Sequence, residues 1–200
     1  MTDGATLDLK CRCGSFRAEI KDASPETGSH LVCYCKDCQA FARFLKAEEL
    51  LKPRGGTGLF QTVPSRVQIL QGKEHLACLR LSPKGPLRWY ASCCDTPVCN
   101  TLSSRKLAFA GFMTPNFEGD NVAETVGPVV AVVHTQGAGV GPGDLQNRGF
   151  LKVSWQILRR HFGELLSGRL SKTPFFDADG QPTAAPRMLT LEERKAATPE

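Results

Sequence analysis

The stretch HLVCYCKDCQAF, residues 30–41, places Cys33, Cys35 and Cys38 within six positions. Three thiols on one short loop offer three sulfurs to a single metal ion and leave a fourth tetrahedral position for water or substrate. Cys35 and Cys38 also have the CxxC spacing of a thiol redox centre. The stretch therefore predicts a metal site, a redox pair or, in the simplest interpretation, small buried hydrophobic residues.

Other cysteines gather in two further clusters, so that eight of the nine in the chain are grouped. The first cluster is Cys11 and Cys13 in CRCG at 11–14, and the second is Cys93, Cys94 and Cys99. Gly14 can adopt a positive φ, which lets backbone amides point towards the sulfurs of the first pair. Ligands one or two residues apart close a small loop around a metal, and the remaining ligands must then come from a distant cluster. Cys78 stands alone in HLACLRL and is expected in the core.

The composition is typical of a loop-rich globular protein, with 41% hydrophobic and 22% charged residues, 19 Gly and 13 Pro in 200 positions. The net charge of +5 is mild and scattered, which predicts no nucleic-acid partner. Apolar runs stay well short of the roughly 18 residues of a membrane span, and the N-terminus has no signal-peptide pattern. We expect a cytoplasmic protein without membrane association, in which clustered thiols bind metal or act in catalysis rather than form disulfides.

The hydrophobic pattern predicts a mainly β protein with a C-terminal α-helix. Short strands are expected at 7–11, 15–20, 30–33, 107–113 and 129–134, with an antiparallel β-meander over 59–93 and helical turns after Cys38. A helix is predicted over 150–170, with its apolar side docked on a sheet. That side consists of Leu151, Trp155, Leu158, Phe162, Leu165 and Leu166. The Pro-rich tail that follows is expected to be extended, with a last short helix capped by Thr190 and Glu193.

The cysteine motifs resemble those of the glutathione-dependent formaldehyde-activating enzyme family, also called the centromere protein V family. Its members carry CxCG, then CxCxxC, then FCxxCGTP; here these are CRCG at 11–14, CYCKDC at 33–38 and an altered YASCCDTP at 90–97. Alignment on the shared TP puts Cys94 on the second family cysteine, Asp95 on the glycine and Ala91 where the first cysteine belongs. One family ligand is therefore missing, and Cys93 is the preferred substitute, with Cys99 as the alternative.

The resemblance implies a β-tent of short antiparallel sheets pinned by zinc, with two zinc ions per chain. A structural zinc would be held by Cys11, Cys13, Cys93 and Cys94, and a catalytic zinc by Cys33, Cys35 and Cys38. It also implies a zinc-dependent carbon–sulfur lyase that acts on adducts of a thiol such as glutathione with a small aldehyde such as formaldehyde. The corresponding domain would span 1–125, followed by a strand and Gly-rich loop at 126–148, the helix at 149–170 and the tail at 171–200.

Two alternatives to the lyase remain open at this point. One is a non-catalytic, zinc-stabilised binding module, because structural zinc alone gives a small loop-rich domain a reason to retain its cysteines. The other is a CxxC redox protein that uses Cys35 and Cys38. His30 is the histidine nearest the triad in sequence, and Trp89 and Tyr90 are expected in the core or as a wall beside the zinc pocket.

Overall fold

Alternating apolar and polar residues near the N-terminus form the smaller of two sheets. The computed structural model describes residues 4–199, and in it Leu7, Leu9 and Ile20 are buried on one face of this sheet while Asp8 between them is exposed. All strand pairs are antiparallel, in the order β10-β1-β2-β5. The strands are β1 (Ala5–Lys10), β2 (Arg17–Ala23), β5 (Val67–Gln71) and β10 (Phe117–Glu118).

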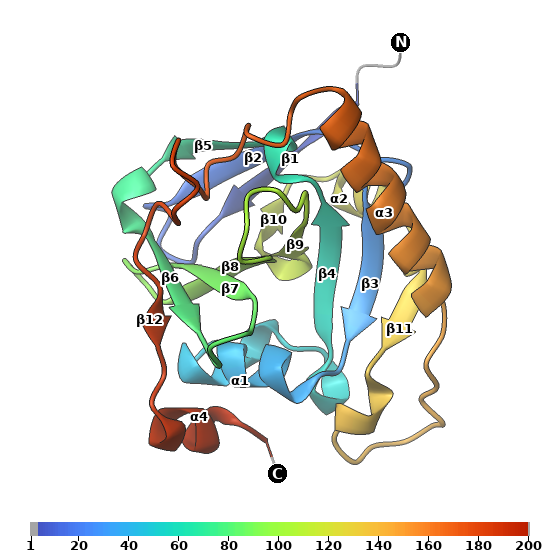
Figure 1. Cartoon of the computed structure of the whole chain (residues 1–200). Coiled ribbons are helices and arrows are strands. Elements are labelled where there is room, and N and C mark those ends of the chain that lie inside the picture. Colours follow the sequence, from blue (N-terminus) through green and yellow to red (C-terminus); the bar gives the residue numbers. More distant parts are fainter. Residues whose placement is uncertain (1–3, 200) are drawn as a thin grey trace.

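Within the described residues, the larger sheet has eight strands in the order β11-β3-β4-β9-β8-β7-β6-β12 (Figure 1). They are β3 (Ser29–Cys33), β4 (Thr57–Thr62), β6 (Leu76–Arg80), β7 (Leu87–Ala91), β8 (Thr96–Thr101), β9 (Ala110–Met113), β11 (Ala131–Val133) and β12 (Arg187–Met188). The inner pairs are antiparallel, whereas the two edge strands β11 and β12 run parallel to β3 and β6. The prediction of a mainly β protein with antiparallel sheets and a C-terminal helix is therefore confirmed.

The main core fills the space between the two sheets. Phe60, Trp89 and Phe112 of the larger sheet are fully buried there with the apolar residues of β1 and β2. The tail closes one end of this core, because Phe175 packs on Trp89 with ring centroids 5.1 Å apart. Each large side chain buried in this way stabilises the fold by about 1.5–3 kcal/mol.

In the part of the chain that the structure describes, four α-helices lie outside the sheets: α1 (Lys36–Phe44), α2 (Val122–Val126), α3 (Phe150–Leu166) and α4 (Leu191–Ala197). The predicted cap of the last helix is confirmed as a reciprocal capping box between Thr190 and Glu193. Helix α4 packs against α1, where Ala197 and Leu189 join Phe41 and Leu45 in a small apolar cluster. Among residues 4–199 no helix is both long and apolar enough to cross a membrane.

The predicted β-meander over 59–93 is wrong as a single run of neighbouring strands. Strand β4 pairs with β3 and β9, and β5 belongs to the other sheet. The meander instead runs β6-β7-β8-β9. Strand β8 was not predicted because its sequence, TPVCNT, overlaps the cysteine motif and has no simple alternation, since all six residues are buried. The predicted strand at 107–113 is confirmed only for its second half.

The helix predicted over 150–170 is confirmed over Phe150–Leu166, but the prediction of its docking side is wrong. The apolar side points to solvent, with Leu151 82% and Trp155 68% exposed. The opposite side faces the larger sheet, where Val153 and Ile157 pack with apolar residues of β3, β4 and β11. Arg160 extends the same inner side by donating hydrogen bonds to a serine hydroxyl of β3.

Candidate metal centres

Four cysteines from two distant segments meet at the surface of the molecule. The sulfurs of Cys11, Cys13, Cys93 and Cys94 all lie within 4.8 Å of one another. Neighbouring sulfurs are separated by 3.4 Å for Cys13 and Cys93, 3.6 Å for Cys11 and Cys13, 3.7 Å for Cys11 and Cys93, and 3.8 Å for Cys93 and Cys94. Four sulfurs at about 2.3 Å from a tetrahedral zinc are themselves about 3.8 Å apart. The four-sulfur set therefore fits one ion of this size.

Backbone geometry holds the first half of the four-sulfur set. Gly14 has a φ of 80° and its amide donates to the carbonyl of Cys11 at 2.9 Å, which closes the CRCG turn. The amide of Phe16 donates to the Cys11 sulfur at 3.2 Å. Such amide donors stabilise the negative charge of a thiolate ligand.

The second half is a turn that docks on the first. Asp95 has a φ of 52°, the left-handed conformation that suits the glycine expected at this motif position. Arg12 joins the two halves, because its amide donates to the Thr96 hydroxyl at 3.1 Å and its guanidinium donates to the Cys94 carbonyl at 2.6 Å. Of the two substitutes considered for the missing ligand, the structure brings Cys93 to this set and leaves Cys99 buried in β8.

The electrostatics of the four-sulfur set favour a thiolate at its exposed member. Hydrogen bonds from Ser15, and then from Cys93 and Cys94, lower the pKa of Cys13 to about 6. Desolvation and hydrogen bonds with Cys13 and Cys11 raise the pKa of Cys93. The lowered pKa favours the thiolate form of Cys13, which is the form that binds a metal.

Three cysteines form a second, local group where β3 passes into α1. Cys33 is the last residue of β3, Cys35 caps α1, and Cys38 lies in the first turn of the helix. The Cys38 amide donates to the Cys35 sulfur at 3.2 Å, as an N-cap requires. The Cys38 sulfur lies 2.7 Å from that of Cys35 and 3.7 Å from that of Cys33. We call this group the triad.

The triad carries negative charge on one sulfur in preference to the others. Hydrogen bonds from Cys33 and Cys35, followed by the charge of Arg88, hold the pKa of Cys38 well below its usual value. Hydrogen bonds with its two neighbours, together with burial, raise the pKa of Cys33. A hydrogen bond from Cys33 lowers the pKa of Cys35, but Cys38 and burial outweigh it and raise the value to about 12. The N-terminus of α1 adds a favourable dipole beside the thiolate.

Arg88 is the site residue that the sequence analysis missed. It lies on β7 and is 3% exposed, with its guanidinium 5.4 Å from the ring centre of Phe41. One guanidinium nitrogen donates to Asn100 at 3.1 Å, but Nε has no partner, and within residues 4–199 Arg88 forms no ion pair with a carboxylate. A buried cation is stabilised by a compensating anion, and the positive charge of Arg88 is among the causes that lower the pKa of Cys38 in the triad. An arginine between Leu87 and Trp89, in a strand otherwise suited to burial, was the available signal.

Other residues considered from the sequence lie outside both groups. Cys78 is buried in the main core, as predicted, and so is Trp89. The ring of His30 is turned to the Gly127 carbonyl, 2.7 Å from Nδ1, and is not part of the triad. Tyr90 is half-buried beside the apolar cluster of α1 and α4.

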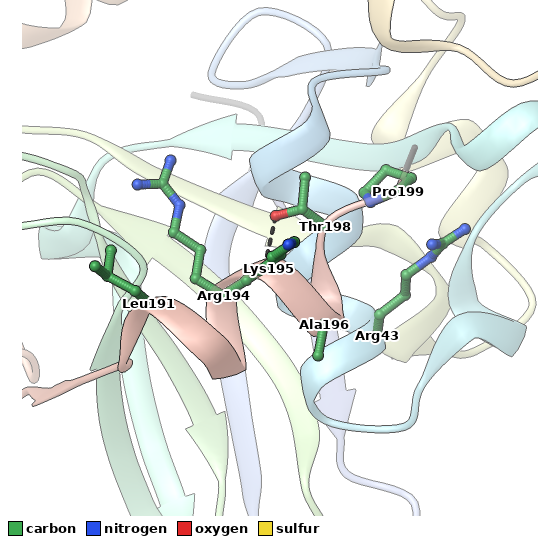
Figure 2. A pocket seen from close by; sticks show the side chains of 7 residues that line it. All are labelled: Arg43, Leu191, Arg194, Lys195, Ala196, Thr198 and Pro199. Carbon is green, nitrogen blue, oxygen red and sulfur yellow. Dashed lines mark hydrogen bonds between the residues drawn. The ribbon is translucent and has the colours of Figure 1, made fainter.

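Two cavities flank α1. One of about 870 Å³ lies between α1 and α4 and is lined by Arg43, Leu191, Arg194, Lys195, Ala196, Thr198 and Pro199 (Figure 2). Its lining is basic, although Arg194 is paired with Asp37 at 3.4 Å. The other, of about 560 Å³, shares Arg43 and also contains Lys52 and Gln39, the residue after Cys38. No cysteine lines either cavity, so neither contains the reactive sulfurs themselves.

A mainly β fold that brings together a four-sulfur set and a three-sulfur triad defines a cysteine-rich protein with two sites able to hold metal ions. The chain belongs to the family of unknown function DUF6151, which matches residues 4–186. Among solved structures, the crystal structure of a Rhodobacter sphaeroides protein, a structural-genomics target, is similar over 61% of this chain and 96% of its own, with 15% identity and a TM-score of 0.42. No curated protein sequence matches the chain.

Proposed function

We propose that this protein is a zinc-dependent carbon–sulfur lyase that joins or separates a small aldehyde and a thiol such as glutathione. In this proposal the fold is a β-tent with two zinc ions per chain, as the motif resemblance to formaldehyde-activating enzymes implies. The four-sulfur set is the structural site and the triad is the reactive site. The observation that carries the proposal is the buried Arg88 beside the triad.

The charge of Arg88 favours a metal at the triad over a redox pair. Three thiolates around a divalent cation carry one net negative charge, which one guanidinium neutralises. A disulfide between Cys35 and Cys38 would remove the thiolate at Cys38 and leave Arg88 buried without a counter-charge. Within the described chain, the absence of a carboxylate partner therefore points to a permanently anionic triad.

The residues of the triad differ in their exposure to solvent. Cys33 and Cys38 are buried with Leu31, Leu59 and other apolar residues, which exclude water from the inner side. Cys35 is only half-buried, so the site opens to solvent on its side. When bound, zinc supplies Lewis acidity towards a thiolate sulfur or a carbonyl oxygen, and three protein ligands leave room for one substrate atom.

The proposed reaction needs no oxidant or reductant. The thiol sulfur forms a bond to the carbonyl carbon, the carbonyl oxygen takes the proton that the thiol loses, and the reverse reaction breaks the carbon–sulfur bond. A thiol that bears carboxylates suits the basic cavity next to the triad, where Arg43 and Lys52 lie near the residue that follows Cys38. This cavity supports an anionic thiol as the substrate class.

The test is the exchange of glutathione and formaldehyde with their adduct, followed by NMR exchange spectroscopy. Zinc-loaded protein should accelerate the exchange, and Cys35→Ser should lower the acceleration at least tenfold, because serine still caps the helix but is a poor zinc ligand. Cys78→Ala is the matched control, since Cys78 belongs to neither sulfur group and should leave the rate unchanged. Zinc-loaded wild type that leaves the exchange rate at its uncatalysed value contradicts the proposal.

A second candidate function, thiol redox exchange, has one specific observation in its favour. The sulfurs of Cys35 and Cys38 are 2.7 Å apart, closer than the edge of about 3.8 Å between two ligands of one tetrahedral zinc. Alkylation and mass spectrometry of the zinc-loaded protein in an oxidising glutathione buffer distinguish the redox function from the metal site. Reversible formation of a Cys35–Cys38 disulfide would favour the redox function, whereas persistence of both thiols favours the metal site.

A further inference from the structure

Helix α3 presents an apolar side to solvent along its whole length. Seven large apolar residues of the helix are about half exposed or more. They are Phe150, Leu151, Trp155, Leu158, Phe162, Leu165 and Leu166. Figure 1 shows α3 lying on the outside of the molecule along β3 and β11, with no other element on its outer side in that view. Contiguous patches of this kind on a protein surface usually mark an interaction site.

The spacing of these residues is that of a helix–helix contact. Leu151, Trp155, Leu158, Phe162 and Leu165 follow one another at intervals of four, three, four and three residues. This is the 3.5-residue repeat with which one helix packs along another. We call these five residues the α3 seam.

The inner side of α3 is already covered by residues of the same chain. Val153 and Ile157 pack in the apolar cluster beside the sheet, and Arg160 donates to the Ser29 hydroxyl at 3.0 Å. Glu164, further along, is buried and paired with Arg169 at 2.9 Å. The α3 seam lies on the opposite side, so it is a second contact surface rather than a displaced part of the core.

The order of residues in the seam is symmetric. Leu158 is at the centre, aromatic residues Trp155 and Phe162 stand on each side of it, and Leu151 and Leu165 are at the ends. In an antiparallel pair of α3 helices, Leu158 meets Leu158, each Trp155 meets a Phe162, and each Leu151 meets a Leu165. A surface that complements itself under a twofold rotation is what an isologous dimer requires.

The exposed area is sufficient for such a contact. Taking roughly 200 Å² for a fully exposed side chain of this size, the exposed fractions of the seven residues leave on the order of 900 Å² uncovered. A stable protein–protein interface buries about 800 Å² on each partner. The patch on one chain therefore matches what a dimer needs from each of its subunits.

We propose that two copies of this chain form a dimer through antiparallel packing of their α3 helices, with Leu158 at the twofold axis. The neighbouring charges favour this occupant over an anionic membrane surface. Arg160 turns inward to Ser29, and the guanidinium of the exposed Arg159 donates to the carbonyl of Glu26 at 3.3 Å. Among the described residues this leaves Lys152 as the basic residue of α3 without a hydrogen-bond or ion-pair partner, fewer free cations than an interfacial helix uses to meet lipid phosphates. The dimer does not depend on the proposed activity, because α3 contributes no residue to either sulfur group.

The first test is analytical ultracentrifugation of the full chain over a range of concentrations. The wild type should sediment at twice the chain mass of 21.8 kDa. Leu158→Glu should raise the dimer dissociation constant at least a hundredfold, because two carboxylates would meet in an apolar contact. Since Leu158 is half exposed in the single chain, the variant should fold, which circular dichroism verifies. Leu191→Glu, the same change at an 85% exposed position on α4, is the matched control and should leave the dimer intact.

The second test uses crosslinking at the axis. Leu158→Cys should give a covalent dimer on mild oxidation, above the background of the wild type, because the two introduced side chains face each other. Leu166→Cys, at the end of the helix, should not. A wild type that sediments as a monomer throughout, a Leu158→Glu dimer as tight as the wild type, or a monomer that binds phosphatidylserine vesicles through α3 would overturn the proposal.

Discussion

The two sulfur groups use the same residue type in opposite settings. The four-sulfur set joins segments about eighty residues apart at the surface, where four of its six sulfur separations are 3.4–3.8 Å and all are within 4.8 Å. The triad is local, spans the start of one helix and is buried beside a cation. A metal bound by the first group would crosslink two distant segments, whereas a metal bound by the triad would be held within one segment, beside a buried arginine. The two groups should therefore respond differently to substitution.

The largest effect is expected in the four-sulfur set. Cys93→Ser should lower the free energy of unfolding by about 5 kcal/mol or more, because structural zinc sites contribute roughly 10–16 kcal/mol of apparent binding free energy. Chemical denaturation of the zinc-loaded proteins measures this. Cys99→Ala, which removes a buried sulfur outside both groups, should cost only about 1–2 kcal/mol. Equal losses of unfolding free energy in the two variants would show that the four-sulfur set contributes no more to stability than a buried sulfur elsewhere.

A slightly smaller effect is expected at Arg88. Arg88→Met should destabilise the zinc-loaded protein by about 3–5 kcal/mol, because it leaves the charge of the triad buried and uncompensated. In a chain that also carries Cys33→Ser, Cys35→Ser and Cys38→Ser, the same change should cost much less, since no thiolate charge remains. Arg43→Met, on the exposed side of α1, is the control. Additive losses in this double-mutant cycle would rule out the charge pairing.

A change at Cys35 separates its role as the cap of α1 from its role as a metal ligand. In the metal-free protein, Cys35→Ser should alter the free energy of unfolding by less than about 1 kcal/mol, because a serine hydroxyl replaces the sulfur that accepts from the Cys38 amide. Cys35→Ala should cost about 1 kcal/mol more than Cys35→Ser for loss of the cap. Thermal denaturation of the two variants provides the comparison. A serine variant as unstable as the alanine variant would contradict the capping role.

The smallest expected effect has the opposite sign. Asp95→Gly should stabilise the protein by about 0.5–1 kcal/mol, because the φ of 52° is strained for an aspartate and free for a glycine. Asp95→Ala should destabilise it by a similar amount. Denaturant titration of the wild type and the two variants gives the order of their stabilities. A glycine variant less stable than the wild type would show that the aspartate side chain stabilises the turn.

Local sequence signals predicted most elements but not how they pair. Strands such as β1 and β2 follow from alternation, and α4 follows from its capping box. Strand pairing depends on contacts far apart in the sequence, so the assignment of β5 to the other sheet could not be seen. The docking side of α3 was predicted wrongly because an apolar stripe shows that a surface will be covered, not which partner covers it.

The sulfur groups were predictable in the same limited sense. The CxC and CxxC spacings identify local pairs, and the family resemblance implied that Cys93 and Cys94 join the first of them. Arg88 could be noticed as a charged residue in a strand otherwise suited to burial, but nothing in LRWYA shows which neighbour its side chain meets. A pattern in sequence identifies ligands that are close along the chain, and only the fold identifies the charge that accompanies them.

The measurement that tests the account most directly is zinc per chain by elemental analysis. It compares the wild type with a variant that carries Cys33→Ser, Cys35→Ser and Cys38→Ser. The account predicts about two zinc ions per wild-type chain. The variant should lose one and stay folded, because the four-sulfur set is intact. A wild type with one zinc that the variant retains would contradict a metal at the triad, and the redox function of Cys35 and Cys38 would then be the better explanation.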